Sequence, residues 1–582
     1  MPSPESSRDL EPPRTLAAGR APLLWVVLPL LAGYLLADIW PGTSAKFLLL
    51  LALLPLTGAL GLVSIIAAAK FSGRKSRMAW GACFLLTATL LAWAWPIVRL
   101  PTPPAIWARL PPREARVTVR VTYAFSSRPD DLTQGALGQI VVAPKILPEL
   151  QGLKVYLRGR LRSGEPPPVR GALLEMDGLL AYVESEIAWP SAQPATASNI
   201  RFNAYLRQQR VWFTLRRWQS YREVEPPPPV PRWLAAQNER LENILRRGPA
   251  ALETPLGDIY VAMLLGKTTL LDDAAREAFT LTGVMHLFAI SGLHVAIMAG
   301  ALWWCLRRVP RLPPLAGDLL TLALLWLYTE ITGGSPSARR AALMFSFYVA
   351  ARWLERPRGA LAAVVAAAVV TLVWDPAVLS SAGFQLSYGV VVGLFLYALP
   401  LLHWARGKFV LWRDLPVASR APWQKCIAWL WDKMLASAAI SWTALLCSTP
   451  LTAEYFGVVS ASGLLLNLLL VPLASGVLCS GAVAMLAGLA PFPPFTWLTW
   501  LANAFGLAAT GVMEMLVQGT ALIPGLHARL QLVPAWSGQV ATLAVLAVML
   551  AIRPRARVPR PWHFLWPLAV LAVLGLLAAR PV

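Results

Sequence analysis

A long apolar run at residues 283–306 constrains the fold of this chain more than any other feature. The hydrocarbon core of a bilayer is crossed by roughly 20 apolar residues, so this run predicts a membrane-spanning helix. Similar runs recur along the chain, and 57% of its 582 residues are hydrophobic. A soluble protein of that composition would expose too much apolar surface, so the sequence predicts a polytopic α-helical membrane protein.

The apolar runs predict about thirteen spans. Three come first, near 22–38, 47–69 and 79–98. The others are expected near 283–306, 315–333, 337–354, 359–374, 377–400, 428–449, 456–488, 493–518, 537–552 and 563–579. The 456–488 run is too long for one simple helix. Its candidate break points are Gly463, Pro472, Gly476 and Gly481.

A segment unlike a membrane helix separates the third run from the rest. Residues 116–122, 138–143 and 154–162 read as short strands with glycine and proline between them, which predicts a small β-barrel. The expected organisation is a tail (1–20), three spans (21–98), the barrel (99–222), a proline-rich linker with an amphipathic helix (223–250), a helical bundle (251–552), and a basic loop with a last span (553–582).

Basic loops predict the orientation. The net charge is +22, and cytoplasmic loops of membrane proteins are enriched in Lys and Arg. The loop at 70–77 and the arginines of the tail place the N-terminus in the cytoplasm and residues 99–250 outside it. The later basic loops, 307–311, 352–358, 403–425 and 553–560, then all fall on the cytoplasmic side.

Polar residues inside the 283–306 run are functional candidates, because lipid cannot hydrate them. His286 and His294 are eight residues apart, so on one helix they lie on nearly the same face. With Ser291 and Gly292 they either line a hydrated pore, or hold the bundle through interhelical hydrogen bonds, or form a catalytic or metal site. The third reading is the weakest, because Ser291 has no histidine from another helix as its base and two histidines do not make a zinc site. We therefore expect no enzyme activity, no metal and no cofactor.

The segment 283–300, GVMHLFAISGLHVAIMAG, resembles the signature of the ComEC family of DNA-uptake channel proteins. Further blocks occur in the family's order: 264–267 with 275–279, 335–343, 375–376 with 382–387, and 467–472. The resemblance covers roughly residues 250–490. It implies a channel that passes single-stranded DNA through the bacterial inner membrane during natural transformation, and an OB-like fold for the barrel.

The motif blocks supply the candidate residues. Those for the pore or motif are His286, Ser291, Gly292, His294, Ser335, Arg339, Arg340, Gln385, Ser387 and Asn467. Arg339 and Arg340 begin a span at its outer end. Two interpretations remain open for them: ordinary extension of their charged ends into the interface, or contact with phosphate at the pore mouth.

The barrel has its own DNA-contact candidates: Lys154, Arg158, Arg160 and Arg162. They occupy alternate positions of one expected strand, so they share one face. Residues 101–200 nevertheless hold eleven basic and nine acidic side chains, which is no basic stripe. The alternative is a structural barrel with solvated charges.

Two sequence elements are not found in the chain. Many family members carry a C-terminal metallo-β-lactamase-like domain, and neither its His-x-His-x-Asp-His cluster nor a P-loop occurs here. The expected partners are therefore single-stranded DNA, membrane lipid, and a separate ATP-driven motor, DNA receptor and nuclease, with a homo-oligomer left open. The alternatives are a transporter of another anionic substrate and a non-conducting structural membrane partner.

Overall fold

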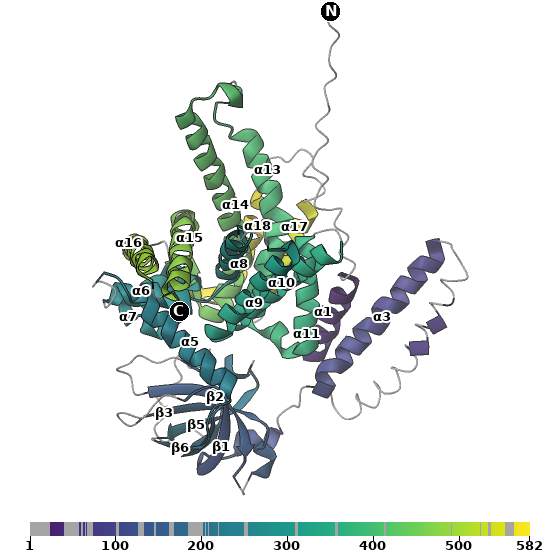
Figure 1. Cartoon of the computed structure of the whole chain (residues 1–582). Coiled ribbons are helices and arrows are strands. Elements are labelled where there is room, and N and C mark those ends of the chain that lie inside the picture. The colour runs from purple at the N-terminus through teal and green to yellow at the C-terminus, as the bar shows by residue number, and fades with distance from the viewer. Residues whose placement is uncertain are drawn as a thin grey trace, which may run out of the picture. The chain divides into compact units, whose positions relative to one another are not determined.

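The computed structural model describes residues 24–39, 74–99, 104–125, 133–144, 147–161, 168–183, 202–249, 254–308, 312–355, 359–412, 415–490, 492–532, 537–552 and 564–581, with single-residue gaps inside some ranges and a few isolated positions between 58 and 66 (Figure 1). The chain forms two compact units. One contains Met1–Pro101 and Leu343–Leu379, and the other contains Thr102–Ala342 and Ser380–Val582.

The first unit is helical. It contains α1 (Leu24–Ile39), α3 (Arg74–Arg99) and α11 (Ala360–Trp374). The α1 and α3 backbones approach closely at Gly33, where an added Cβ would lie 2.4 Å from the carbonyl oxygen of Thr89. The Tyr34 hydroxyl donates to the carbonyl of Leu372 at 3.0 Å and ties α1 to α11. The expected tail lies outside the described residues, as does the expected span 47–69 apart from a few isolated positions.

The second unit begins with the β-barrel. Its strands are β1 (Arg113–Ala124), β2 (Thr133–Val142), β3 (Lys154–Arg160), β4 (Leu173–Tyr182), β5 (Val211–Trp218) and β6 (Tyr221–Glu225). Five of them close in the order β1-β2-β3-β5-β4, because β4 also pairs with β1, and β6 extends the sheet along β4. The β3–β5 pair is parallel and the other pairs are antiparallel. A closed five-stranded barrel fits the expected OB-like domain.

The barrel core follows the strand alternation. Val117, Val119 and Val121 of β1 point inward and are buried, as is Trp218 at the end of β5. Gly159 of β3 lies against Trp218, where an added Cβ would fall 2.2 Å from the indole ring, so only glycine fits here. The sequence predicts the first three strands but not β4, β5 or β6, whose residues show weaker alternation.

The rest of the second unit is helical. Its helices are α5 (Pro229–Leu245), α6 (Pro255–Leu265), α7 (Asp273–Leu281), α8 (Gly292–Leu306), α9 (Pro314–Ile331), the first part of α10 (Pro336–Trp353), α12 (Ala382–Gly393), α13 (Leu399–Lys408), α14 (Pro422–Phe456), α15 (Ser462–Gly488), α16 (Pro493–Ala521), α17 (Ser537–Ile552) and α18 (Trp566–Ala578). A π-helical turn at Leu394–Ala398 joins α12 to α13.

Six helical segments of the described residues are long and apolar enough to cross a bilayer. They are Met285–Leu306, Pro314–Ile331, Ala382–Lys408, Pro422–Phe456, Ser462–Gly488 and Pro493–Ala521. Shorter apolar helices include Pro255–Leu265, Ala360–Trp374 and Ser537–Ile552. The chain is thus a multi-pass membrane protein with a small barrel domain. The count of about thirteen spans stays a prediction.

The candidate break points within 456–488 were wrong, because Gly463, Pro472, Gly476 and Gly481 all lie inside the single helix α15. The chain is interrupted before that helix instead. Helix α14 ends at Phe456 because Gly457 takes a left-handed conformation (φ 65°) that ends the helix. A short strand, β7 (Val458–Ser460), follows, and α15 then continues without interruption through Pro472. Gly481 serves packing instead, since an added Cβ would lie 2.4 Å from Leu264.

Candidate functional site

The histidine motif folds as a loop leading into a helix. Gly283 is left-handed (φ 75°), residues Met285–Leu287 form a single 3-10 turn, and Ser291 is the N-cap of α8. The expectation that His286 and His294 share one helix face is therefore wrong. His286 lies before the helix and is exposed, with Nδ1 3.2 Å from the Gly283 carbonyl. His294 lies in the first turn of α8 and is 1% exposed.

The hydrogen bonds of His294 define its tautomer. Nδ1 lies 3.0 Å from the Ser291 hydroxyl oxygen and 3.4 Å from the Ser291 backbone nitrogen. A backbone N–H only donates, so Nδ1 accepts and a neutral ring carries its proton on Nε2. Among the described residues Nε2 has no hydrogen bond of acceptable geometry, although the Met263 and Leu287 carbonyls lie near the ring. His294 thus holds a buried donor that is poorly satisfied.

The Ser291–His294 contact is local. No histidine from another helix was expected near Ser291, and His294, 3.0 Å away, belongs to the first turn of the helix that Ser291 caps. The geometry is that of a helix cap between residues i and i+3. A nucleophile–base pair needs a third group to orient the base, and among the described residues no carboxylate is hydrogen-bonded to His294. The described residues also contain no group of three His, Cys, Asp or Glu side chains able to hold a metal.

Ser335 connects the motif loop to α10. Its hydroxyl donates to the Ile290 carbonyl at 3.4 Å and accepts from the Ala338 backbone N–H at 3.3 Å. The first bond reaches the motif loop and the second caps α10. Gly292 packs nearby, where an added Cβ would lie 3.9 Å from the Ala341 methyl group. The N-termini of α8 and α10 therefore lie close together.

The two adjacent arginines of α10 have opposite environments. Arg339 forms a bidentate ion pair with Glu330 at the end of α9, with both N–O distances 2.7 Å. Glu330 also lies 3.4 Å from Arg170 of the barrel domain. Arg340 is 5% exposed, and its Nη2 donates to the Gly383 carbonyl at 2.8 Å and the Ser387 hydroxyl at 2.9 Å. Its Nε is buried without a partner among the described residues.

Further contacts close a ring of helix ends. The Tyr455 hydroxyl at the end of α14 lies 3.1 Å from Gln385 Oε1 on α12. Ser462 at the start of α15 donates to the Thr282 carbonyl at 3.4 Å. We name as the helix-end ring the four segments joined in this way: Thr282–His294, Ser335–Ala341, Gly383–Ser387 and Tyr455–Ser462. It brings together nine of the ten motif candidates.

Asn467 is the remaining motif candidate. It lies on α15, just over one turn beyond Ser462. Its Oδ1 is buried and has no partner among the described residues. Asn467, His294 and Arg340 are therefore the three motif candidates that carry an unsatisfied buried polar atom. The sequence did not assign Glu330, Tyr455, Ser460 or Ser462 to the site, since acids and hydroxyls at span ends are usually structural.

Lys267, from an early motif block, belongs to an ion-pair network instead. Its ammonium group lies 2.5 Å from Glu242 of α5, and Arg246 contacts both Glu242 (3.1 Å) and Asp258 of α6 (2.8 Å). Burial raises the pKa of Glu242, but Lys267 and then Arg246 outweigh burial and hold this pKa below its usual value. The network ties α5 to α6 and to the turn that follows α6.

The Lys267→Met substitution should destabilise the protein by about 1–3 kcal/mol, since it leaves a half-buried carboxylate poorly paired. A lowered folded-state pKa means that ionised Glu242 stabilises the wild type fully above the ordinary glutamate pKa of about 4.3, and that this contribution is lost as pH falls further. Thermal unfolding of the purified protein between pH 3 and 7 measures both effects. If Lys267→Met lowers the free energy of unfolding as much in a Glu242→Gln background as in the wild type, Lys267 and Glu242 are not coupled.

The barrel candidates Lys154, Arg158 and Arg160 are exposed on one face of β3, while Arg162 lies outside the described residues. Arg158 pairs in register with Arg216 of β5. Burial first, and the charge of Arg158 second, lower the pKa of Arg216. The same face carries Tyr156, from which a chain of neighbouring aromatic rings extends with centroids 5.1–6.1 Å apart: Tyr123, Phe125, Tyr156, Phe202 and Tyr205. Basic groups thus lie beside aromatic ones.

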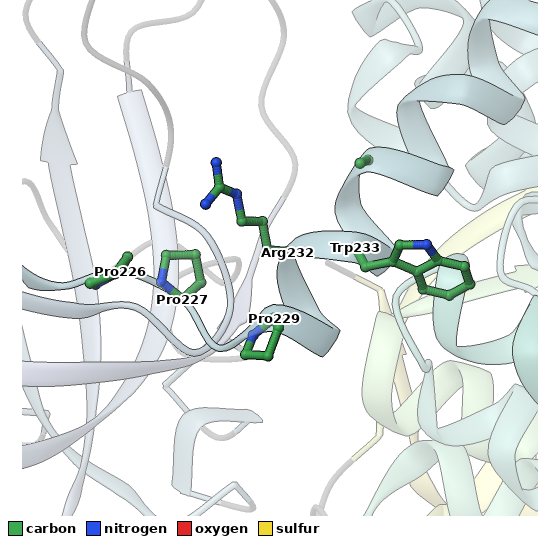
Figure 2. A pocket seen from close by; sticks show the side chains of 6 residues that line it. Pro226, Pro227, Pro229, Arg232 and Trp233 are labelled. Atoms are coloured by element: carbon green, nitrogen blue, oxygen red, sulfur yellow. The ribbon is translucent and has the colours of Figure 1, made fainter.

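An open surface pocket lies at the start of α5. It is lined by Pro226, Pro227, Pro229, Arg232, Trp233 and Ala236. Figure 2 shows Arg232 and Trp233 projecting in different directions from the first turn of the helix, next to the proline run. None of the motif candidates lines this pocket.

Comparison with known proteins gives one family and three relatives. Residues 263–557 match the family described as Competence protein. ComE operon protein 3 of Bacillus subtilis is 37% identical over 138 residues, covering 24% of this chain and 18% of that protein. Competence protein ComA of Neisseria gonorrhoeae is 27% identical over 328 residues, covering 55% and 40%. Recombination protein 2 of Haemophilus influenzae is 24% identical over 293 residues, covering 48% and 34%.

The chain spans less than half the length of each of these relatives. No solved structure matches it. The family match includes every motif candidate from His286 to Asn467, and therefore the whole helix-end ring.

Proposed function

The chain belongs to the competence protein family, and from that premise we propose that it passes single-stranded DNA through the bacterial inner membrane during natural transformation. The observation that carries this proposal is Arg340. It is a buried cation inside the helical bundle, and its acceptors among the described residues are a carbonyl and a hydroxyl, both neutral. A passing phosphate would supply the anionic partner that the guanidinium fits.

Burial of the Arg340 charge lowers the stability of the fold. A buried charge loses its hydration and is normally compensated by an opposite charge. Neutral acceptors replace only part of that hydration, and Nε is left without any described partner. Such a cost in a membrane bundle is typical of residues on a substrate path. Arg339 carries no such cost because Glu330 neutralises it.

The surroundings of Arg340 also favour an anion. The N-termini of α8 and α10 meet in the helix-end ring, and helix N-termini carry partial positive charge. The buried Nε2–H of His294 would be a further donor. Both side chains are covered in this conformation, so we propose that the ring opens during transport.

We propose that the barrel end of the bundle faces away from the cytoplasm. The Arg170–Glu330 contact places the end of α9 and the start of α10 near the barrel, and basic residues such as Arg307 and Arg308 follow α8 at the other end. Lys and Arg favour the cytoplasmic side. DNA would then meet the aromatic and basic face of β3 before the helix-end ring, as single strands bind such faces elsewhere.

The proposal needs other proteins for force, capture and strand degradation. No P-loop occurs in the sequence, so we propose a separate motor, with a separate DNA receptor and nuclease. We also propose that the chain itself is not an enzyme.

Uptake of fluorescent duplex DNA by host cells tests the function. We expect a deletion strain to accumulate DNA outside the inner membrane and to bring none into the cytoplasm, whereas the wild type does both. Unchanged cytoplasmic uptake in the deletion would refute the DNA passage. A transporter of another anion would then be the better explanation of Arg340.

A further inference from the structure

Helices α13 and α14 form a hairpin that extends beyond α15, which packs against α14 (Figure 1). The hairpin lies at the end of the bundle away from the barrel. Helix α12 starts beside Arg340 and the barrel-side ring, and the continuous helix Ala382–Lys408 runs from there to the opposite end. Helix α14 then returns to the ring at Tyr455.

The length of α14 places part of it outside the bilayer. Its 35 residues include a stretch without charged side chains at 434–453. At about 1.5 Å per residue this stretch is about 30 Å long, the thickness of the hydrocarbon core. The preceding residues 422–433 extend roughly 18 Å further, whereas the headgroup layer on one side is about 5–8 Å thick. The tip of the hairpin therefore reaches water.

The tip is rigid. Arg406 of α13 and Asp432 of α14 form a bidentate ion pair at 2.6 and 2.8 Å. The Trp431 indole donates to the Phe409 carbonyl at 2.8 Å. In the connecting loop, Arg420 donates to the carbonyls of Leu415 and Trp412. These bonds hold together the ends of the two helices and the described part of the loop between them.

The surface of this rigid tip combines aromatic and basic groups. Trp423 is 58% exposed and Trp429 is 62% exposed. Lys425 lies between them and is also exposed, and the Lys433 ammonium group is 5.7 Å from the Trp429 ring centroid. The described residues of 406–433 contain five basic side chains and one acid, Asp432, which Arg406 neutralises.

We propose that residues 408–412 and 415–433, named here the hairpin platform, bind single-stranded nucleic acid on the side of the membrane opposite the barrel. Exposed indole rings stack with bases of any sequence, and lysines contact the phosphates. Trp423 and Trp429 are six residues apart, which separates them by about 9 Å along the helix, enough for different bases. Indoles and lysines are also common at lipid interfaces, but the tip extends past the headgroup layer.

The identity of the strand as imported DNA rests on the proposed function; the binding itself does not. The test uses the full chain in lipid nanodiscs and a fluorescein-labelled oligothymidine, with binding followed by fluorescence anisotropy. The variant Trp423→Ala/Lys425→Gln/Trp429→Ala is expected to bind at least about tenfold more weakly, given the strength of base stacking. The matched control is Trp497→Ala/Trp500→Ala, which removes two exposed indoles from α16, a helix without Lys or Arg. It should change binding less than about twofold.

Cys426 provides a local readout because it is exposed within the platform. A membrane-impermeant maleimide should label Cys426, and oligothymidine should protect it, as measured by peptide mass spectrometry. Failure to label would place the tip in lipid and overturn the proposal, and so would labelling that oligothymidine leaves unchanged. If oligothymidine binds the platform but the deletion strain takes up DNA normally, the proposed function is overturned and this inference is not. If DNA uptake requires the protein but oligothymidine does not bind the platform, this inference is overturned and the proposed function is not.

Discussion

The Arg340→Gln substitution is expected to lower transformation by about 10- to 100-fold without loss of protein stability. A charge-assisted hydrogen bond contributes roughly 1.5–3 kcal/mol, and each 1.4 kcal/mol corresponds to about tenfold. Glutamine keeps a polar amide near the position of Arg340 Nε, although it is two bonds too short to replace Nη2 at the Gly383 carbonyl and the Ser387 hydroxyl. It removes a buried charge that has only neutral acceptors, so the melting temperature should stay the same or rise. If Arg340 served stability alone, its substitution would lower the melting temperature together with transformation.

Two further variants sharpen this result. Arg340→Lys keeps the charge but loses the planar fork, so it should transform at an intermediate level. Arg339→Gln breaks the pair with Glu330, and we expect a smaller loss of transformation together with a lower melting temperature. Transformation frequency, protein level in the membrane and thermal unfolding give the three readouts. If Arg340→Gln transforms normally, Arg340 does not meet the substrate.

The contrast between Arg339 and Arg340 shows where sequence reasoning stops. From the sequence, both arginines are predicted at the start of a span, and the same two roles, extension into the interface or contact with phosphate, apply to each. What separates them is Glu330, nine residues before Arg339, and the backbone of α12, more than forty residues after Arg340. Hydrophobic periodicity says where helices lie, but it does not say which side chain of a neighbouring helix meets which.

The histidine motif shows a second limit. Its apolar run correctly predicted a membrane segment, and the segment Met285–Leu306 is one of the candidate spans. The prediction that His286 and His294 share one helix face was wrong, because Gly283 turns the chain and Ser291 starts a new helix. Both residues are visible in the sequence, since glycine favours left-handed turns and serine favours N-caps. The barrel was recognisable from β1 to β3, whereas its closure depends on the long-range pairing of β1 with β4.

Substitutions of His294 can distinguish a structural role from contact with substrate, because its two ring nitrogens have different roles. Nδ1 accepts from Ser291, while Nε2 holds the unsatisfied proton. His294→Ala removes both, leaves a cavity in a tightly buried position and should destabilise the protein by about 3 kcal/mol. Transformation should then fall together with the amount of protein in the membrane.

His294→Asn separates the two roles. An asparagine side chain places an acceptor near the position of Nδ1, so the contact to the Ser291 N–H can be kept while the Nε2–H is lost. We expect a melting temperature closer to the wild type than to His294→Ala, and transformation reduced by about tenfold, the loss of one hydrogen bond to an anion. Thermal unfolding and transformation frequency measure the two effects. If His294→Asn is stable and transforms as the wild type does, His294 acts only as the cap of α8, and Arg340 becomes the one buried donor of the helix-end ring with a role in transport.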